Sequence, residues 1–315
     1  MDAPSLPETY RAILTIRRFE ERLLSLHQEG LIQGSMHLCN GQEAIPVGAC
    51  RELRADDALT ATYRGHGWAI ARGLPLPDLF AELMGRASPL CGGRGGSAYL
   101  CGAPYGFLGE NSIVGAGVPI AAGAALAARR DGAGAVSLVS IGDGALNQGA
   151  VGEALNFAAA LALPLVVVVE NNIYSEMTPI KEMVAIDPLA QRAAGFGIPS
   201  VTVDGNDTAV VQAAVAEAVA RARSGGGPTL VEAMTERLVG HYTGDAQQYR
   251  PAGEVEAAKT REPLTRLRAA AGQELGAELA VVDEEVEATI ESAVQEAMGY
   301  PRPDPAGAAL GVYVD

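Results

Sequence analysis

Asp143 and Asn172 are the two residues whose types and positions point most directly to chemistry. Asp143 follows an apolar run at residues 135–141, and Asn172 follows a second apolar run at 165–169, with a helical pattern at 148–161 between them. Parallel strands joined by a helix present their carboxyl ends at one edge of a sheet. The sequence therefore predicts that Asp143 and Asn172 meet in one crevice.

Their side chains fit one kind of ligand. Carboxylate and carboxamide oxygens are the ligands that magnesium prefers, and phosphate oxygens usually complete its octahedron. Gly142 and Gly144 flank Asp143 and allow the backbone to approach a ligand closely, while the helix that follows offers free N–H groups to a diphosphate. We therefore expect a magnesium–diphosphate site. The alternative is an ordinary strand–helix–strand unit with turn residues at its ends.

A wider alternation of strands and helices has to position these residues. Strands are predicted at 135–141, 165–169, 201–203 and 229–233, and helices at 119–130, 148–161 and 207–223, with Asp207 as a helix N-cap. Further helices are predicted at 8–30, 75–85, 254–259, 265–271 and 283–298, and a glycine-rich loop at 91–97. This order predicts an α/β fold, a three-layer, mostly parallel sheet with helices on both faces and helical terminal extensions.

The chain shows no clear linker and no internal repeat. We therefore predict a single domain over residues 1–315, with a core at about 35–240 and a helical C-terminal extension at about 251–300.

Composition excludes several classes of protein. Apolar residues make up 48% of the 315 residues and charged residues 19%, which is typical of a globular chain. The net charge of -15 argues against nucleic-acid binding, which needs clustered Lys and Arg. The N-terminal residues have no signal-peptide pattern, and the most apolar stretch, 161–169, contains Pro164 and is too short to span a bilayer. We expect no membrane contact and a cytoplasmic location.

Four cysteines, Cys39, Cys50, Cys91 and Cys101, are widely spaced and form no CxxC pair. They are expected to be reduced, partly buried thiols rather than a disulfide scaffold. A zinc site from Cys91, Cys101 and a distant histidine is the alternative, and the spacing gives it no support.

An ordered series of motifs carries a resemblance to a known family. Gly142-Asp143-Gly144, twenty-six residues and then Asn171-Asn172 resemble the thiamine diphosphate signature. The other matching segments are Arg17–Glu21, His37-Leu38, Gly41–Ala44, Tyr63–Gly67, Gly93–Ser97, Ile113–Ala116, Val203–Asp207, Gly227–Leu230, Gly240-His241 and Tyr249-Arg250. Up to about Pro263 the chain resembles the alpha subunit of the first component of pyruvate, acetoin and branched-chain 2-oxo-acid dehydrogenases. The resemblance implies the thiamine diphosphate-binding fold.

The resemblance implies a role for each matching position. The metal ligands would be Asp143, Asn172 and the backbone carbonyl of Tyr174; the cofactor would also contact Tyr63, Arg64, Val114, Gly144, Ala145 and His241; and the histidines taken as catalytic are His37, His66 and His241. Arg64 suits a phosphate independently, because a guanidinium fork matches phosphate geometry. Histidine is the usual proton carrier near neutral pH.

These assignments have structural alternatives. Tyr63 and Arg64 could be a surface turn pair. His37 and His66 could be structural histidines with satisfied hydrogen bonds, and the loop at 91–97 has no catalytic role assigned.

The resemblance also implies an activity and partners. Such a subunit acts in the cleavage or decarboxylation of pyruvate, acetoin or a related 2-oxo acid, and the acyl group passes to a lipoyl-bearing acyltransferase component. The cofactors would be thiamine diphosphate and magnesium. In two-chain members the carboxylate that activates the cofactor belongs to a beta subunit, so we expect two alpha and two beta chains and no activity from this chain alone.

Several positions depart from the family pattern. Ser112 replaces a glycine, Ala98-Tyr99 replaces Met-His, and Tyr242 stands where mitochondrial pyruvate dehydrogenases carry a regulatory serine. Residues 240–245 are closer to the acetoin type. Rival interpretations are a transketolase-like thiamine enzyme, a non-catalytic assembly or regulatory subunit with this fold, and a Rossmann dinucleotide enzyme, for which no GxGxxG fingerprint follows the first strand.

Overall fold

A six-stranded sheet forms the centre of the computed structural model, which describes residues 4–307 and 309. Its strands are β1 (Ala58–Thr62), β2 (Phe107–Asn111), β3 (Ser137–Gly142), β4 (Leu165–Asn171), β7 (Ser200–Asp204) and β8 (Thr229–Met234). They lie in the order β2-β1-β3-β4-β8-β7, and every neighbouring pair is parallel. The predicted α/β class is confirmed.

The strand β4 shows why this sheet is buried on both faces. Val166 and Val168 belong to one apolar core, and Val167 and Val169 belong to the other. A strand covered on both faces needs apolar residues at successive positions instead of alternating ones. That requirement explains the continuous apolar run by which the strand was predicted.

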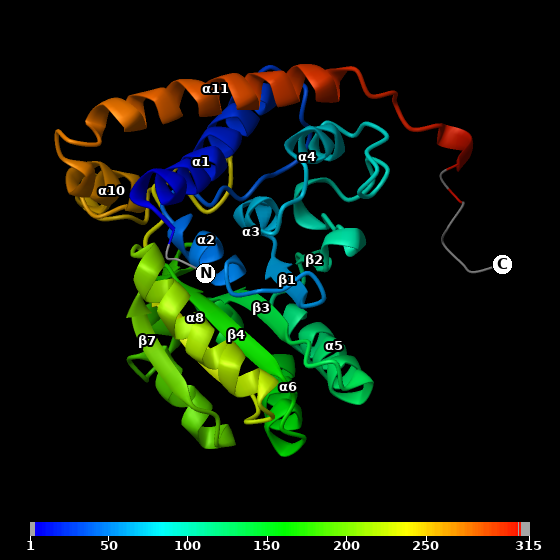
Figure 1. Cartoon of the computed structure of the whole chain (residues 1–315), viewed down its shortest axis with the longest axis vertical. Helices are drawn as coiled ribbons and strands as arrows, with labels where there is room; N and C mark the ends of the chain where they lie inside the picture. The colour runs from blue at the N-terminus through cyan, green and yellow to red at the C-terminus, as the bar shows by residue number, and fades with distance from the viewer. Residues whose placement is uncertain (1–3, 308, 310–315) are drawn as a thin grey trace.

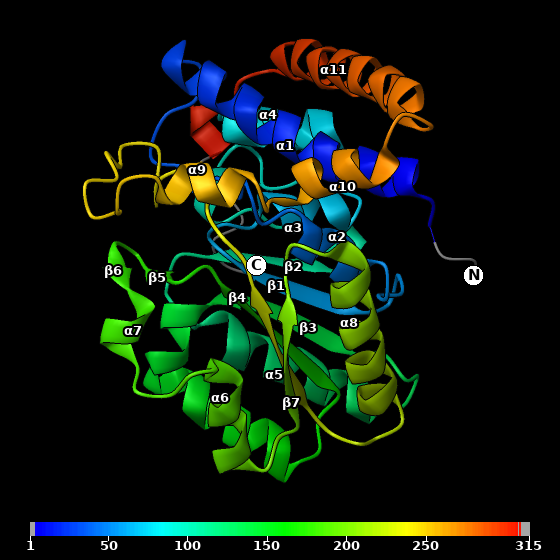
Figure 2. The ribbon, with the colours of Figure 1, turned by 90° about the vertical axis from the view of Figure 1, so that its left-hand side faces the viewer.

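Helices cover each face of the sheet. α5 (Gly117–Asp131) and α6 (Gly149–Ala160) share one core with it, and α2 (Ala44–Cys50) and α8 (Thr208–Arg223) share the other (Figure 2). The predicted N-cap of α8 is confirmed, because the Asp207 carboxylate accepts hydrogen bonds from the backbone N–H groups of Ala209 and Val210.

A further group of helices lies at one end of the sheet. These helices are α1 (Leu6–Gln28), α3 (His66–Ala71), α4 (Leu76–Leu83), α9 (Glu254–Lys259), α10 (Pro263–Ala271) and α11 (Gly276–Met298). Figure 1 shows α1 and α11, from opposite ends of the chain, running side by side. α11 begins at Gly276, earlier than the predicted residue 283.

Smaller elements complete the chain around the sheet edge. They are the hairpin β5 (Tyr174–Ser175) and β6 (Thr178–Pro179), α7 (Ile180–Met183), and the 3-10 turns η1 (Gly96–Ala98), η2 (Ala103–Tyr105), η3 (Asp143–Asn147), η4 (Leu189–Phe196) and η5 (Pro305–Gly307). The turn η3 separates β3 from α6, so the N–H groups next to Asp143 belong to this turn. Within the described part of the chain, no helix combines the length and apolarity needed to cross a membrane.

Candidate functional site

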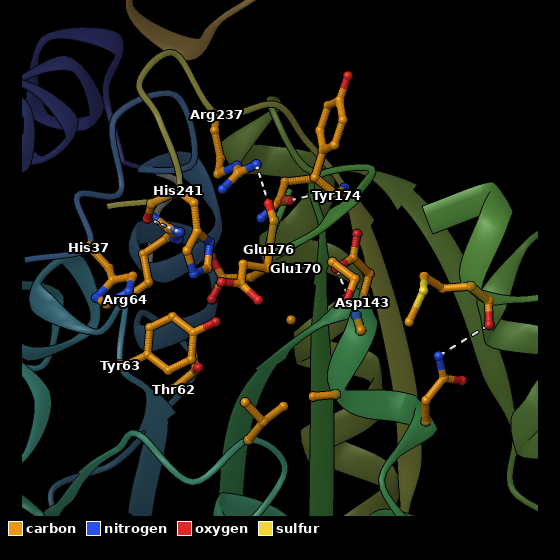
Figure 3. A pocket seen from close by; sticks show the side chains of 18 of the residues that line it. His37, Thr62, Tyr63, Arg64, Asp143, Glu170, Tyr174, Glu176, Arg237 and His241 are labelled. Atoms are coloured by element: carbon orange, nitrogen blue, oxygen red, sulfur yellow. Dashed lines mark hydrogen bonds between the residues drawn. The ribbon is translucent and has the colours of Figure 1, made fainter. Parts of the chain in front are cut away.

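A cavity of about 400 Å³ lies at the carboxyl edge of the sheet, where β1, β3 and β4 end. Its lining residues are His37, Gln42, Thr62, Tyr63, Arg64, Ser112, Val114, Gly142, Asp143, Gly144, Ala145, Asn147, Gln148, Glu170, Asn172, Tyr174, Ser175, Glu176, Met183, Arg237 and His241. Asp143 and Asn172 therefore meet at one edge, as the strand pattern predicted. Figure 3 shows His37, Tyr63, Arg64 and His241 on one side of the cavity and Asp143 on the other.

The Asp143 carboxylate is buried, and only one of its two oxygens has a hydrogen-bond partner. Its Oδ1 accepts a hydrogen bond of 2.7 Å from the backbone N–H of Gly144, while its Oδ2 has no partner. Burial raises the pKa of Asp143 to about 6, although Arg237 and Arg64 act in the opposite direction. A buried oxygen without a partner is costly, so a cation at this position would compensate for it.

The side chain of Asn172 is held by a chain of hydrogen bonds. Its Nδ2 donates to Gln42 Oε1 at 2.9 Å, and Gln42 Nε2 donates to Glu170 Oε2 at 3.0 Å. Glu170 also accepts from Trp68 Nε1 at 2.8 Å and from the Ser140 hydroxyl. These contacts fix which atom of the amide is the oxygen, and Oδ1 is left with only a 3.3 Å contact from the Tyr174 N–H.

Tyr174 contributes to the cavity through its backbone. Figure 3 shows its ring turned away from the cavity. The hydroxyl donates to Glu254 Oε2 at 2.7 Å, and the guanidinium groups of Arg237 and Arg250 lie 5.5 and 5.4 Å from the ring centroid. Only the main chain of this residue is therefore placed to serve as a ligand.

Two arginines bring positive charge to the cavity. Arg64 donates to the carbonyl oxygens of Leu38 and His241, which fixes its orientation. Arg237 is 1% exposed and donates through Nη2 to the Glu176 carbonyl oxygen at 2.9 Å and to the Tyr249 hydroxyl, while its Nε and Nη1 have no partner. Burial, with Arg64 nearby, lowers the pKa of Arg237 to about 10. These features fit an anion between the two guanidinium groups.

Arg237 was not singled out from the sequence, although a signal was present. It follows the predicted strand 229–233 just as Asp143 follows the strand 135–141. The rule that brought Asp143 and Asn172 to one edge applies equally to the segment after the fourth strand. The cavity residues Gln42, Thr62, Glu170 and Glu176 were also given no role, because none of them has a distinctive spacing.

Two of the three candidate histidines lie together in the cavity wall. The ring centroid of His37 is 4.4 Å from that of Tyr63 and 4.9 Å from that of His241. Burial, followed by the charge of Arg64, lowers the pKa of His37 to about 4 and that of His241 to about 3. Both imidazoles are therefore neutral at physiological pH and can donate or accept a hydrogen bond.

His66 lies elsewhere. It is 1% exposed and does not line the cavity. Its Nδ1 is 2.9 Å from Glu20 Oε2, and its Nε2 is 2.9 Å from the Ser97 hydroxyl. Burial disfavours the charged ring, but the Glu20 carboxylate outweighs burial and raises the pKa of His66 to about 9. His66 is thus a buried ion-pair partner of Glu20 outside the cavity lining.

The remaining predicted residues define the shape of the cavity. A Cβ atom at Gly144 would lie 2.2 Å from the Ser175 hydroxyl oxygen, so the turn after β3 leaves no room for a larger residue. Ala145 and Val114 both line the cavity, and so does Ser112. Tyr99 is 55% exposed and lies outside the lining.

The donor set can bind a metal only together with other ligands. In the described residues, no group of three or more His, Cys, Asp or Glu side chains could hold a metal ion. A cation here would take one carboxylate, one amide oxygen, a backbone carbonyl and oxygens from a bound anion, which is how magnesium is commonly held beside phosphates.

Comparison with known proteins identifies chains of related sequence. Residues 11–306 match the family described as "Dehydrogenase E1 component". The alpha subunit of acetoin:2,6-dichlorophenolindophenol oxidoreductase from Cupriavidus necator is 44% identical, over 100% of this chain and 96% of its own length. The subunit of the same name from Bacillus subtilis is 42% identical, over 97% and 92%. The alpha subunit of the pyruvate dehydrogenase E1 component from Zymomonas mobilis is 41% identical, over 96% and 86%.

Proposed function

This chain belongs to the dehydrogenase E1 component family, and from that premise we propose that it is the alpha subunit of a thiamine diphosphate- and magnesium-dependent acetoin or 2-oxo-acid dehydrogenase. The family resemblance seen in the sequence is confirmed by the comparisons. One observation carries the proposal: a buried carboxylate oxygen of Asp143 and two buried N–H groups of Arg237, all without partners, belong to one cavity. A metal–diphosphate group satisfies all three.

Asp143, Asn172 and the Tyr174 carbonyl are the proposed metal ligands. The support for this set is the orphaned Asp143 Oδ2, the Asn172 amide oriented by Gln42, and the Tyr174 ring turned out of the cavity. One charged ligand leaves a divalent cation with net positive charge, which favours a bridge to an anionic group.

Tyr63, Arg64 and Arg237 are the proposed phosphate-binding side chains, together with the backbone at Gly144 and Ala145. Guanidinium groups bind phosphate oxygens in a bidentate manner, and glycine lets the main chain come close. Val114, which is apolar and 40% exposed, would lie against the ring system of the cofactor.

When bound, thiamine diphosphate supplies the electron sink for cleaving the bond next to the substrate carbonyl. The neutral rings of His37 and His241 are suited to donate a hydrogen bond to a bound group, or accept one from it, in the cavity. His66, which is buried two residues after Arg64, is proposed to position the Tyr63–Arg64 segment through its bonds to Glu20 and Ser97.

A beta subunit is the proposed partner, in an assembly of two alpha and two beta chains that passes the acyl group to a lipoyl-bearing acyltransferase. Its support is a set of exposed apolar side chains: Val114 at 40% and Met183 at 46% line the cavity, and Ile113 at 67% lies between the lining residues Ser112 and Val114 in the chain. The relatives are named as alpha subunits, which implies a second chain. A cytoplasmic location remains a prediction from the sequence.

Acetoin and pyruvate are the substrates to test first, because the named relatives are an acetoin oxidoreductase and a pyruvate dehydrogenase component. The chain is co-expressed with a candidate beta chain, and dye reduction is followed with acetoin, pyruvate and branched 2-oxo acids. Each assay is run with and without thiamine diphosphate and magnesium, and with each subunit alone.

We expect cofactor-dependent turnover of one of these substrates by the complex and none by either subunit alone. If a well-folded complex binds no cofactor and turns over no substrate, the enzyme proposal fails. That outcome would favour a non-catalytic assembly or regulatory subunit.

A further inference from the structure

Two thiols bracket the glycine-rich loop between α4 and β2. The Cys91 Sγ lies 3.3 Å from the backbone nitrogen of Cys101 and 3.6 Å from its carbonyl oxygen. Both thiols are free and partly exposed, whereas Cys39 and Cys50 are buried. Neither Cys91 nor Cys101 lines the metal–diphosphate cavity, so nothing in the proposed function uses them.

The position of Cys91 Sγ is compatible with a bond to Cys101. Disulfides span Cα atoms that are roughly 4.4–6.8 Å apart. A sulfur in contact with the amide of the other cysteine brings the two Cα atoms close to this range. Rotation about the Cα–Cβ bonds could then bring the sulfurs together with little movement of the backbone.

The loop keeps the thiols close through contacts that do not involve sulfur. The buried Glu82 carboxylate accepts hydrogen bonds from the N–H groups of Cys91, Gly93, Gly95 and Gly96, at distances from 2.7 to 3.3 Å. Farther along the loop, the Ser97 hydroxyl is bonded to His66. A loop ordered in this way has already lost much of the entropy that closing a disulfide would cost.

We infer that Cys91 and Cys101 are a reversible thiol–disulfide pair that closes this loop when a peroxide is present. Burial raises the pKa of Cys91 to about 12, so this thiol is protonated at neutral pH in the reduced pair. One sulfur of the pair attacks one peroxide oxygen, which yields a sulfenic acid and one water. The other sulfur then attacks the sulfenic sulfur, and the sulfenic oxygen leaves as a second water. In sum, two thiols and one hydrogen peroxide give one disulfide and two waters.

The sequence makes this bond easy to detect. Cleavage after Arg86, Arg94 and Arg129 puts Cys91 in the tryptic peptide 87–94 and Cys101 in the peptide 95–129. The cofactor-loaded complex with its beta subunit is treated with hydrogen peroxide, blocked with an alkylating reagent and digested without reductant. The matched variants are Cys91→Ser and Cys101→Ser, with Cys50→Ala as a control for a buried thiol.

The expected product is a cross-linked pair of peptides 87–94 and 95–129 that disappears on reduction. It should form in the wild type and in Cys50→Ala, and in neither loop variant. We also expect oxidation to slow native-state cleavage after Arg94 at least about tenfold, because the closed loop opens less often.

Three outcomes would overturn the inference. In the first, the peptides stay unlinked while either cysteine is over-oxidised or unmodified. In the second, Cys91 or Cys101 links to a different cysteine. In the third, the link forms only after the complex has lost its thermal unfolding transition.

Discussion

At the scale of single residues, the main feature of the cavity is a set of buried polar atoms without hydrogen-bond partners. Asp143 Oδ2 and the Nε and Nη1 groups of Arg237 are buried without partners. Each such group costs roughly 1–3 kcal/mol or more when left unsatisfied. Under the proposed function, a cation and an anion bound together would satisfy all three atoms and offset that cost.

Arg237 offers the clearest single-residue prediction. Arg237→Gln should weaken thiamine diphosphate binding about 10- to 100-fold, because a hydrogen bond to a charged group contributes roughly 1.5–3 kcal/mol. The melting temperature of the cofactor-free protein should fall much less than the loss of cofactor affinity would suggest. The reason is that the substitution also relieves the repulsion between Arg237 and Arg64. Calorimetric titration and thermal unfolding together measure both effects.

Arg221→Gln, an exposed change on α8, is the matched control. Unchanged cofactor affinity in Arg237→Gln would show that this guanidinium does not contact the phosphates.

Glu110 is a second buried group, and it predicts a dependence of stability on pH. It is 5% exposed, neither carboxylate oxygen has a partner, and burial raises its pKa to about 8, with Glu20 adding to the shift and His66 opposing it. Between pH 4.5 and about 8, the folded chain keeps a proton that the unfolded chain has lost. Glu110 therefore lowers stability increasingly as the pH rises through this window.

Glu110→Gln imitates the protonated acid and removes that dependence. The free energy of unfolding of this variant should match that of the wild type near pH 5. Near pH 9 it should be higher than that of the wild type by about 2–4 kcal/mol. Urea unfolding at pH 5, 7 and 9 measures the difference, with the exposed Glu217→Gln as control. A difference that stays constant across this range would mean that Glu110 is ionised throughout.

At the scale of elements, the sequence was most informative where an apolar run or a helical pattern continued over the whole element. β3, β4 and β8, together with α5, α6 and α8, were predicted because both sheet faces are buried and the runs are continuous. β1 and β2 were missed, because Ala58–Thr62 has a single large apolar residue and Phe107–Asn111 contains a glycine and a glutamate. β1 pairs with β2 and β3, and β2 pairs with β1, and no local pattern in the sequence reveals this pairing.

The turn after β3 carries the element-scale prediction. Gly144→Ala would bring its Cβ within 2.2 Å of the Ser175 hydroxyl oxygen and 2.8 Å of the Ser175 Cβ, so the hairpin β5–β6 has to shift. We expect a loss of about 1–3 kcal/mol in the free energy of unfolding. Denaturant unfolding of the isolated chain measures this loss.

Gly142→Ala is the matched control two residues away, because a Cβ there meets nothing within 4 Å and φ is -78°. Adding Ser175→Gly to Gly144→Ala should restore most of the lost stability. Equal stability of the two single glycine variants would contradict the predicted close contact.

At the scale of the whole molecule, the proposed function requires a second chain to complete the site. Residues from both ends of the chain form a joint helical group, since α1 packs against α10 and α11, and the predicted extension at 251–300 contributes to it. The single-domain assignment for residues 1–315 stays a prediction. The sequence could not show which residues complete the site, because under the proposed function they belong to another chain.

The most direct test of the account is a titration of thiamine diphosphate into the complex of this chain with its beta subunit. The titration is run with and without magnesium, for the wild type and for Asp143→Ala. We predict saturable binding that requires magnesium, weakened at least about 100-fold in Asp143→Ala, because a first ligand should matter more than the outer-shell partners of a metal site. Binding of equal strength without magnesium and in Asp143→Ala would contradict the metal–diphosphate site on which the proposed function depends.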